Sequence, residues 1–224
     1  MTVDLKVEQQ ASLDRPRYPY SAVARFFFRS MDLMVGSEAT LAKATLIETL
    51  AGVPYRAWQN RQYPSMKRNR DDELVGKAPA ILAWAREAED NEHQHLLVIE
   101  EKMRQDGVKE PWYLSPPSPQ LMARSYALLT WAMAQLDTRR GFLLNAELED
   151  HAEHTYAQMV RDHPEWEEQP VAGEVVTKYG DFETWADVFR RIGLDERDHM
   201  NNSFRFAGKH DRVVQYEGMP EAAG

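Results

Sequence analysis

Two copies of one short motif place potential metal ligands three residues apart. One copy is Glu92-x-x-His95 and the other is Glu196-x-x-His199. Glu48 precedes the first copy by 44 residues and Glu149 precedes the second by 47, so each predicted bundle helix contributes one glutamate or one motif. This is the ligand set of a carboxylate-bridged di-iron or di-manganese centre in a four-helix bundle. We therefore predict a two-metal site whose ligands are Glu48, Glu92, His95, Glu149, Glu196 and His199.

The predicted ligands interrupt the apolar faces of their helices. Glu196 and His199 continue the helical spacing of Trp185, Phe189 and Ile192, and the other four ligands fall on comparable stripes. An unpaired buried carboxylate costs on the order of several kcal/mol, so a core that holds four of them requires cations. Two ferrous ions would neutralise the four carboxylates.

A more ordinary interpretation also exists, because a single Glu-x-x-His pair is nearly expected by chance. Acids and histidines on a solvated helix face can simply pair with one another. We assign that interpretation to the titratable residues off the stripes: Asp90, His93, Glu100, Glu101, Glu147, Asp150 and His154. The register and the near-equal spacing favour a metal site for the six residues above.

Composition limits the other possibilities. The 224 residues contain no cysteine, which excludes disulfides, thiolate ligands and iron–sulfur clusters. A formal net charge of −9 argues against nucleic acid as a partner. The N-terminus lacks the features of a cleavable targeting peptide, and no apolar run is long enough to span a bilayer. We therefore expect any contact with a membrane to involve one leaflet.

Helical periodicity runs through most of the chain, and no alternating strand pattern is found. We predict helices at about 20–35, 37–60 with a bend or break at Pro54, 72–105, 120–136, 141–161 and 182–208. They are separated by a charged connection at 61–72, a proline-rich turn at 110–119, a junction at 137–141 and a loop at 162–180.

The predicted fold class is all-α, a ferritin-like four-helix bundle with two additional apolar, membrane-facing helices. Residues 1–19 are expected to form an extended N-terminal arm, 20–208 the bundle domain, and 209–224 a polar C-terminal tail. The segment 26–28 is three phenylalanines flanked by arginines. It suits either an ordinary core helix or an interfacial amphipathic helix, and 126–134 is a second candidate patch.

Three residues near the predicted ligands have two interpretations each. Tyr156 lies two helical turns after Glu149 on the same face, and is either a core tyrosine or a redox-active phenol. Asn91 and Asp195 directly precede the ligand glutamates of the two motifs. They are either surface caps or the outer hydrogen-bond acceptors that metal-bound histidines need.

At these residues the chain resembles the alternative oxidase family of di-iron quinol oxidases, and within it the plastid terminal oxidase branch. The similarity covers roughly residues 20–205. Three features resemble the plastid type: Val53-Pro54-Tyr55, His151 and Asp187-Val188-Phe189. The resemblance rests on four blocks, which are Ile47-Glu48-Thr49-Leu50-Ala51, Asn91-Glu92-His93-Gln94-His95, Glu149-Asp150-His151-Ala152-Glu153-His154-Thr155-Tyr156 and Asp195-Glu196-Arg197-Asp198-His199.

The resemblance implies two iron ions per chain on the six ligands and a catalytic role for Tyr156, which would supply an electron during O–O cleavage. It also implies that Ala152 and Thr155 line a quinol pocket. The arginine that usually precedes the first ligand block in the family is either replaced by Lys43, which we then expect to bind the quinol, or lost. The arginine and aspartate of the quinol site map loosely onto Arg25, Arg29 and Asp32.

The implied activity is non-electrogenic oxidation of ubiquinol or plastoquinol coupled to reduction of O2 to water. The implied partners are quinol, O2, a membrane surface and a second copy in a homodimer. The expected location is the bacterial cytoplasmic membrane or the thylakoid. Two other functions fit the same ligands: a di-iron oxygenase acting on a lipophilic substrate, and an iron-binding or ferroxidase bundle.

Overall fold

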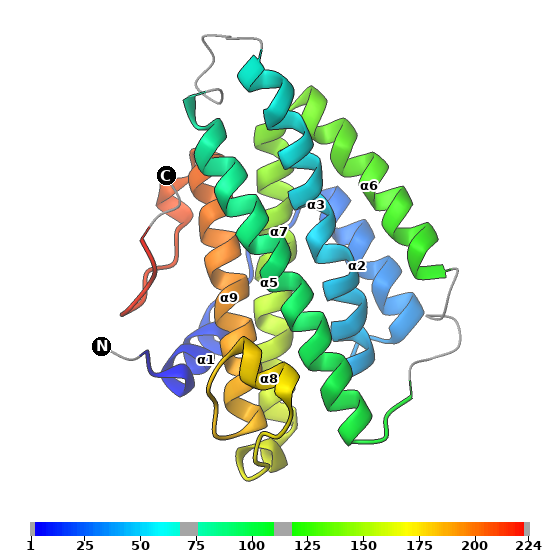
Figure 1. Ribbon diagram of the computed structural model, residues 1–224, viewed down its shortest axis with the longest axis vertical. Coiled ribbons are helices and arrows are strands. Elements are labelled where there is room, and N and C mark those ends of the chain that lie inside the picture. The colour runs from blue at the N-terminus through cyan, green and yellow to red at the C-terminus, as the bar shows by residue number, and fades with distance from the viewer. Residues whose placement is uncertain (1–2, 68–75, 110–117, 222–224) are drawn as a thin grey trace.

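The computed structural model describes residues 3–67, 76–109 and 118–221 (Figure 1). Within them the only β pairing is an isolated bridge between Pro170 and Thr184, so the predicted all-α class is confirmed. The helices are α1 (Leu5–Asp14), α2 (Ala22–Val35), α3 (Leu41–Lys67), α5 (Ala78–Gln105), α6 (Ser118–Leu136), α7 (Thr138–Asp162), α8 (Glu174–Tyr179) and α9 (Trp185–Phe206), with 3-10 turns η2 (Pro164–Glu167) and η3 (His210–Arg212).

Four long helices form the bundle that holds the predicted ligands. Helix α7 packs along α9 and α3 packs along α5, and these are the two most extensive helix pairs. The stripes that carry the ligands are buried in the bundle, as the periodicity predicts; Ala85, Phe142 and Phe189, for example, have no exposed surface. Helices α2 and α6 lie on the α3 side of the bundle, away from α9 (Figure 1).

Side-chain N-caps determine where two of the bundle helices, α7 and α9, begin. Asp137 accepts a hydrogen bond from the Arg140 backbone N–H and begins α7 directly after α6 ends at Leu136, which agrees with the predicted junction. Thr184 caps α9 in the same way through Asp187 N–H. These caps fix where the helices start, and therefore the register of the ligand stripes.

The predicted break at Pro54 is wrong, because α3 continues through it to Lys67 and occupies part of the expected 61–72 connection. Val53, Pro54 and Tyr55 are all buried, and tertiary packing outweighs the one backbone hydrogen bond that proline removes. Residues 68–75 of that connection and 110–117 of the proline-rich turn lie outside the described residues.

The expected extended arm at 1–19 is also wrong for its central part. Residues 5–14 form α1, which Asp4 caps and which packs on α7 and α9. Arg15 reaches Asp150 and Glu153 on α7, each at 2.5 Å. Asp150 and His154 are buried beneath this segment rather than solvated, which corrects the assignment of both to a solvent-exposed face.

Arg197 connects α1, α7 and α9 at the centre of this network. Its side chain is 1% exposed, donates to Glu153 Oε1 at 2.9 Å and to Ser12 Oγ at 2.8 Å, and also pairs with Glu8. Glu153 is itself fully buried. The network therefore keeps a buried cation and its carboxylate partners mutually satisfied.

The segment 162–180, expected to be a loop, contains η2 and the short helix α8. The buried Lys102 on α5 orders this region: its ammonium donates to Gln169 Oε1 at 2.6 Å and lies over the rings of Trp166 and Trp185. Sequence patterns do not reveal such a contact, because the partners are far apart along the chain.

Large apolar side chains project from the outer sides of α2 and α6. Phe26 is 75% exposed and Trp131 is 52% exposed, and Leu33, Leu128 and Leu136 are also open to solvent. Among the described helices, none is long and apolar enough to cross a membrane.

We predict that Arg197→Met lowers the free energy of unfolding by about 1–3 kcal/mol, because it removes one of the two arginines that pair with the buried Glu153 and leaves only Arg15 to balance that carboxylate. Chemical denaturation monitored by circular dichroism would measure the change. Lys178→Met is the matched control, since Lys178 pairs with Glu174 on the surface of α8. Equal effects of the two substitutions would contradict the assignment of a buried network.

Candidate metal centre

The four bundle helices bring the six predicted ligands to one place in the core. Glu48 comes from α3, Glu92 and His95 from α5, Glu149 from α7, and Glu196 and His199 from α9. They form two groups, each with ligand atoms within 4.8 Å of one another. One group is Glu48, Glu92, His95 and Glu196, and the other is Glu92, Glu149, Glu196 and His199. Because Glu92 and Glu196 belong to both groups, they lie where carboxylates would bridge two metal ions.

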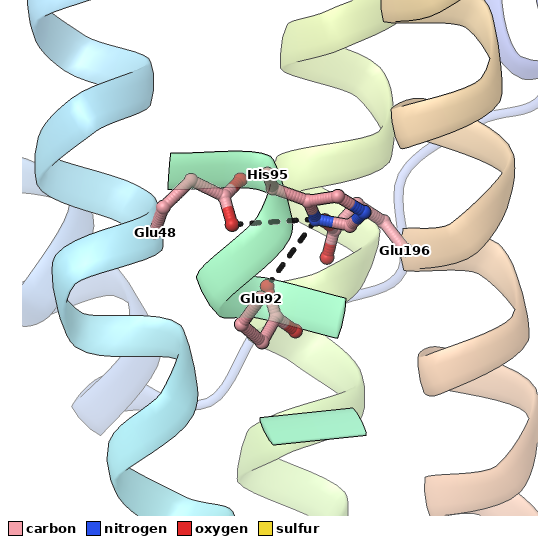
Figure 2. A group of neighbouring side chains, drawn as sticks. All are labelled: Glu48, Glu92, His95 and Glu196. Carbon is pink, nitrogen blue, oxygen red and sulfur yellow. Dashed lines mark ion pairs between the residues drawn. The ribbon is translucent and has the colours of Figure 1, made fainter. Parts of the chain in front are cut away.

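Both histidines turn Nδ1 toward the carboxylates. His95 Nδ1 lies 3.1 Å from Glu196 Oε1 and 3.4 Å from Glu48 Oε2. His199 Nδ1 lies 2.9 Å from Glu92 Oε1. Figure 2 shows the members of the first group turned toward one another from three helices.

Seven polar atoms of this cluster are buried without hydrogen-bond partners. They include both carboxylate oxygens of Glu92 and Glu196, Glu48 Oε2, and Nδ1 of both histidines. Leaving a buried polar atom unpaired costs about 1–3 kcal/mol, and more for a charged group. Metal ions would satisfy all of these atoms at once, and an all-oxygen-and-nitrogen donor set suits iron or manganese. The residues present therefore fit a two-metal centre.

The electrostatics of the cluster without metal favour bound protons. Burial, reinforced by the neighbouring Glu92, raises the pKa of Glu48 to about 8 and that of Glu149 to about 7. Burial also raises the pKa of Glu196 well above its ordinary value. For His199, burial is outweighed by the nearby Glu92 and Glu149 carboxylates, which raise its pKa to about 9. Metal ions would displace these protons.

Asp195 contacts His95 on the side of the ring opposite the cluster of carboxylates. Its Oδ2 lies 3.2 Å from His95 Nε2, so that nitrogen donates to Asp195 and Nδ1 is the one that faces the carboxylates. Tyr179 donates to the same Asp195 oxygen at 2.6 Å, and Arg191 Nε donates to the other at 2.8 Å. Asn91 donates to Asp195 at 3.4 Å, so it supports the carboxylate and not a histidine.

Glu149 is held by residues that the sequence did not single out as functional. Tyr55 Oη donates to Glu149 Oε1 at 2.7 Å, and Asn145 Nδ2 donates to the same oxygen at 2.8 Å. Asn145 also donates to Ser203 Oγ at 3.1 Å. Helical spacing could have found all three, because Tyr55, Asn145 and Ser203 lie seven or four residues from predicted ligands.

Tyr156 is fully buried beside the centre and donates its hydroxyl proton to Glu48 Oε1. Its ring stacks against Phe189 with centroids 6.2 Å apart. Burial, together with the Glu48 carboxylate, raises the pKa of Tyr156 well above its ordinary value. The phenol therefore keeps its proton beside a predicted ligand.

Two hollows lie on the α2 side of the bundle, and one of them reaches the centre. An apolar one lies between α2, α3, α6 and α7 and reaches Asn145 and Glu149. Its apolar walls are Phe27, Phe28, Met31, Ile47, Leu50, Ala51, Tyr126 and Leu148. A polar one is lined by both Lys43 and Thr155, with Arg17 and Asp32. His151 lines both hollows.

The residues predicted for a quinol pocket have different positions. Lys43 is buried and pairs with Asp32 at 2.5 Å, and Thr155 donates to the His151 carbonyl at 2.8 Å. Ala152 lies in the core cluster with Tyr156 and lines neither hollow. Arg25 and Arg29 are exposed on α2 and also lie outside both hollows, whereas Arg17, which the sequence did not indicate, lines the polar one.

A family model described as "Alternative oxidase" matches residues 8–208, which include all six predicted ligands and Tyr156. A search of curated protein sequences gives no match.

We predict that metal loading stabilises the protein more at pH 8 than at pH 5.5. Glu48 and Glu149 have folded-state pKa values of about 8 and about 7 against an ordinary 4.5, so without metal they hold protons that the unfolded chain releases. Stability from these acids is present below pH 4.5 and is lost as pH rises to about 8. His199, raised from 6.5 to about 9, acts in the same direction between those values.

Melting temperatures with ferrous or manganous ion, and with a chelator, measure the effect. We expect the increase caused by metal to be larger at pH 8 by at least about 5 °C. An increase that is equal at the two pH values would mean that metals do not replace protons in this cluster.

A second prediction concerns Asp195. Asp195→Asn should weaken iron retention about 10–100-fold, because the carboxylate that orients His95 loses its charge. Iron release to a chelator from the loaded protein gives the measurement. Glu100→Gln is the control, because Glu100 is exposed on the same helix as His95. Retention as tight as in the unsubstituted protein would show that Asp195 does not orient a ligand.

Proposed function

Because the chain belongs to the alternative oxidase family, we propose that it couples oxidation of ubiquinol or plastoquinol to reduction of O2 to water at a di-iron centre. The family implies a di-iron quinol oxidase, and the buried cluster of carboxylates and histidines fits such a centre. The observation that supports this function most is the position of the apolar hollow beside the metal centre. The two ligand groups share Glu92 and Glu196, and the hollow reaches Glu149, which belongs to the second group.

The ligands would hold two iron ions, and bound iron supplies the redox chemistry with O2 that side chains cannot provide. The protein contributes orientation and exclusion of water. Tyr55 and Asn145 hold Glu149 in one position, while Asp195 fixes the tautomer of His95. The hydrogen bond from Tyr156 to Glu48 keeps a phenol proton next to the centre, which supports a role for Tyr156 in the transfer of an electron and a proton.

The two hollows suit a lipophilic molecule with a polar head. An isoprenoid-like tail would contact Phe27, Met31 and Leu50 in the apolar hollow, and the head would lie toward the polar hollow that Lys43 and Thr155 line. Helices α2 and α6, which bound the apolar hollow, also carry the exposed apolar side chains. A substrate dissolved in a membrane could therefore enter through that side.

We assign α2 and α6 to contact with one membrane leaflet, of the bacterial cytoplasmic membrane or the thylakoid. Phe26 and Trp131 would lie at the level of the acyl chains, and Arg25 and Arg29 at the head groups. A homodimer through the same apolar side is the alternative use of these residues.

Oxygen uptake with decyl-ubiquinol and decyl-plastoquinol tests the function. We expect cyanide-insensitive uptake, with water as the product, and the faster of the two quinols identifies the substrate. Tyr156→Phe should retain two irons per chain yet lose at least about 100-fold in turnover. Unchanged turnover of Tyr156→Phe would overturn the role of the phenol.

The same assay separates the two other functions. An oxygenated organic product would indicate a hydroxylase or desaturase, which the apolar hollow could also accommodate. Accumulation of iron beyond two ions per chain, without quinol oxidation, would indicate a ferroxidase.

Membrane contact gives a further prediction. The double substitution Phe26→Ser and Trp131→Ser should weaken binding to liposomes at least about tenfold, because two exposed apolar side chains are lost. Cosedimentation measures the change, and Val7→Ser, an exposed apolar residue on α1, is the control. If the double variant binds liposomes normally but loses a dimer in solution, this side contacts a second copy instead.

A further inference from the structure

His151 lies on α7 between the apolar and the polar hollow and forms part of both walls. Its side chain is buried, with the residue only 8% exposed. The imidazole stacks on Phe28 with ring centroids 3.9 Å apart and an interplanar angle of 14°. The edge of the Tyr20 ring lies nearby, at 6.3 Å between centroids. These aromatic contacts fix the plane of the ring.

The position of the ring proton follows from Arg17. Arg17 Nη1 lies 2.8 Å from His151 Nδ1. A guanidinium can only donate, so Nδ1 must accept, and the single proton of the neutral imidazole lies on Nε2. In a protonated ring Nδ1 would also carry a hydrogen, so two donors, the Nδ1–H and the Arg17 N–H, would face each other. The contact therefore selects the neutral Nε2–H tautomer.

The Nε2–H group has no hydrogen-bond partner. His151 Nε2 is buried and unpaired in the structure, although native proteins pair nearly all such groups. Two other polar side chains that line the polar hollow, those of Lys43 and Thr155, are already engaged. Lys43 Nζ contacts Asp32 Oδ1 at 2.5 Å and the carbonyls of Gly36 and Ser37 at 3.4 Å. Thr155 donates its hydroxyl proton to the His151 carbonyl. His151 Nε2–H is thus a buried donor without a protein partner, on a ring that lines both hollows.

We propose that His151 donates this hydrogen bond to an oxygen of the quinol or quinone head group, and that Arg17 is the positioning residue that fixes the donating tautomer. The proposal rests on the proposed function, since it concerns the substrate of the same site. It makes a neutral imidazole, instead of the Lys43 ammonium, the group that recognises the head. The ligand must present an acceptor oxygen at the end of an apolar tail.

Equilibrium binding to the iron-loaded protein tests the proposal without turnover. Two probes are compared by titration calorimetry: oxidised decyl-ubiquinone, and an alkylbenzene with the same tail and no oxygen. His151→Phe keeps an aromatic ring on Phe28 and removes the donor. It should weaken quinone binding about tenfold and leave alkylbenzene binding unchanged.

His163→Phe is the matched control, because His163 also stacks on an aromatic ring, that of Trp166, but is partly exposed and lines neither hollow. Arg17→Leu should weaken quinone binding as His151→Phe does, and Arg17→Lys, which keeps a donor, should restore most of it. Arg25→Leu removes an exposed arginine from α2 and should have no effect.

The outcomes separate the proposal from the proposed function. Quinone binding that His151→Phe leaves unchanged, or an equal loss for both probes, overturns the role of His151 even if the protein oxidises quinol. A selective loss of quinone binding supports that role even if no quinol is oxidised, in which case the proposed function fails alone. If the unsubstituted protein binds neither probe, both are wrong.

Discussion

Burial of four carboxylates in the centre of a helical bundle is the constraint on which this structure depends. Glu48, Glu92, Glu149 and Glu196 have at most 3% of their surface exposed, and they are too close together to ionise without compensating charge. Protons compensate in the absence of metal, and cations would do so in its presence. The register of the four helices and the binding of ions therefore depend on the same cluster, in which hydrogen bonds from Tyr156, Tyr55 and Asn145 hold two of the carboxylates, Glu48 and Glu149.

The two motifs are alike in sequence, yet their surroundings differ. Asp195, which precedes the second motif, supports the histidine of the first across the bundle, while Asn91, its counterpart, donates to that same carboxylate. Glu149 has its own support from Tyr55 and Asn145. The two Glu-x-x-His motifs therefore contribute to an asymmetric site. Its two metal positions would differ in their hydrogen bonding and in their access from the apolar hollow.

Helical periodicity was sufficient to predict the all-α class, the core stripes and the six residues that gather in the centre, because buried acids in an apolar stripe are conspicuous. It failed where the deciding contacts join distant parts of the chain. Asp150 and His154 lie off the stripe and look solvent-exposed until α1 covers them, and Arg15 pairs with Asp150 across 135 residues. The prediction of a break at Pro54 failed for a related reason. Proline locally disfavours a helix, but the packing of α3 on α5 outweighs that preference.

The polar side of the hollow shows why residue type alone does not decide which group meets a ligand. Lys43 stands where the resemblance leads one to expect an arginine, but its three acceptors on α2 and the following turn leave its ammonium engaged. An uncharged donor next to the apolar hollow is also cheaper to desolvate than a cation. Arg17 stays exposed and keeps its charge in water while it orients His151 through one hydrogen bond. The positive charge of Arg17 thus remains at the surface, while its hydrogen bond to Nδ1 places the His151 proton on Nε2. A ligand oxygen could accept a hydrogen bond from that Nε2–H.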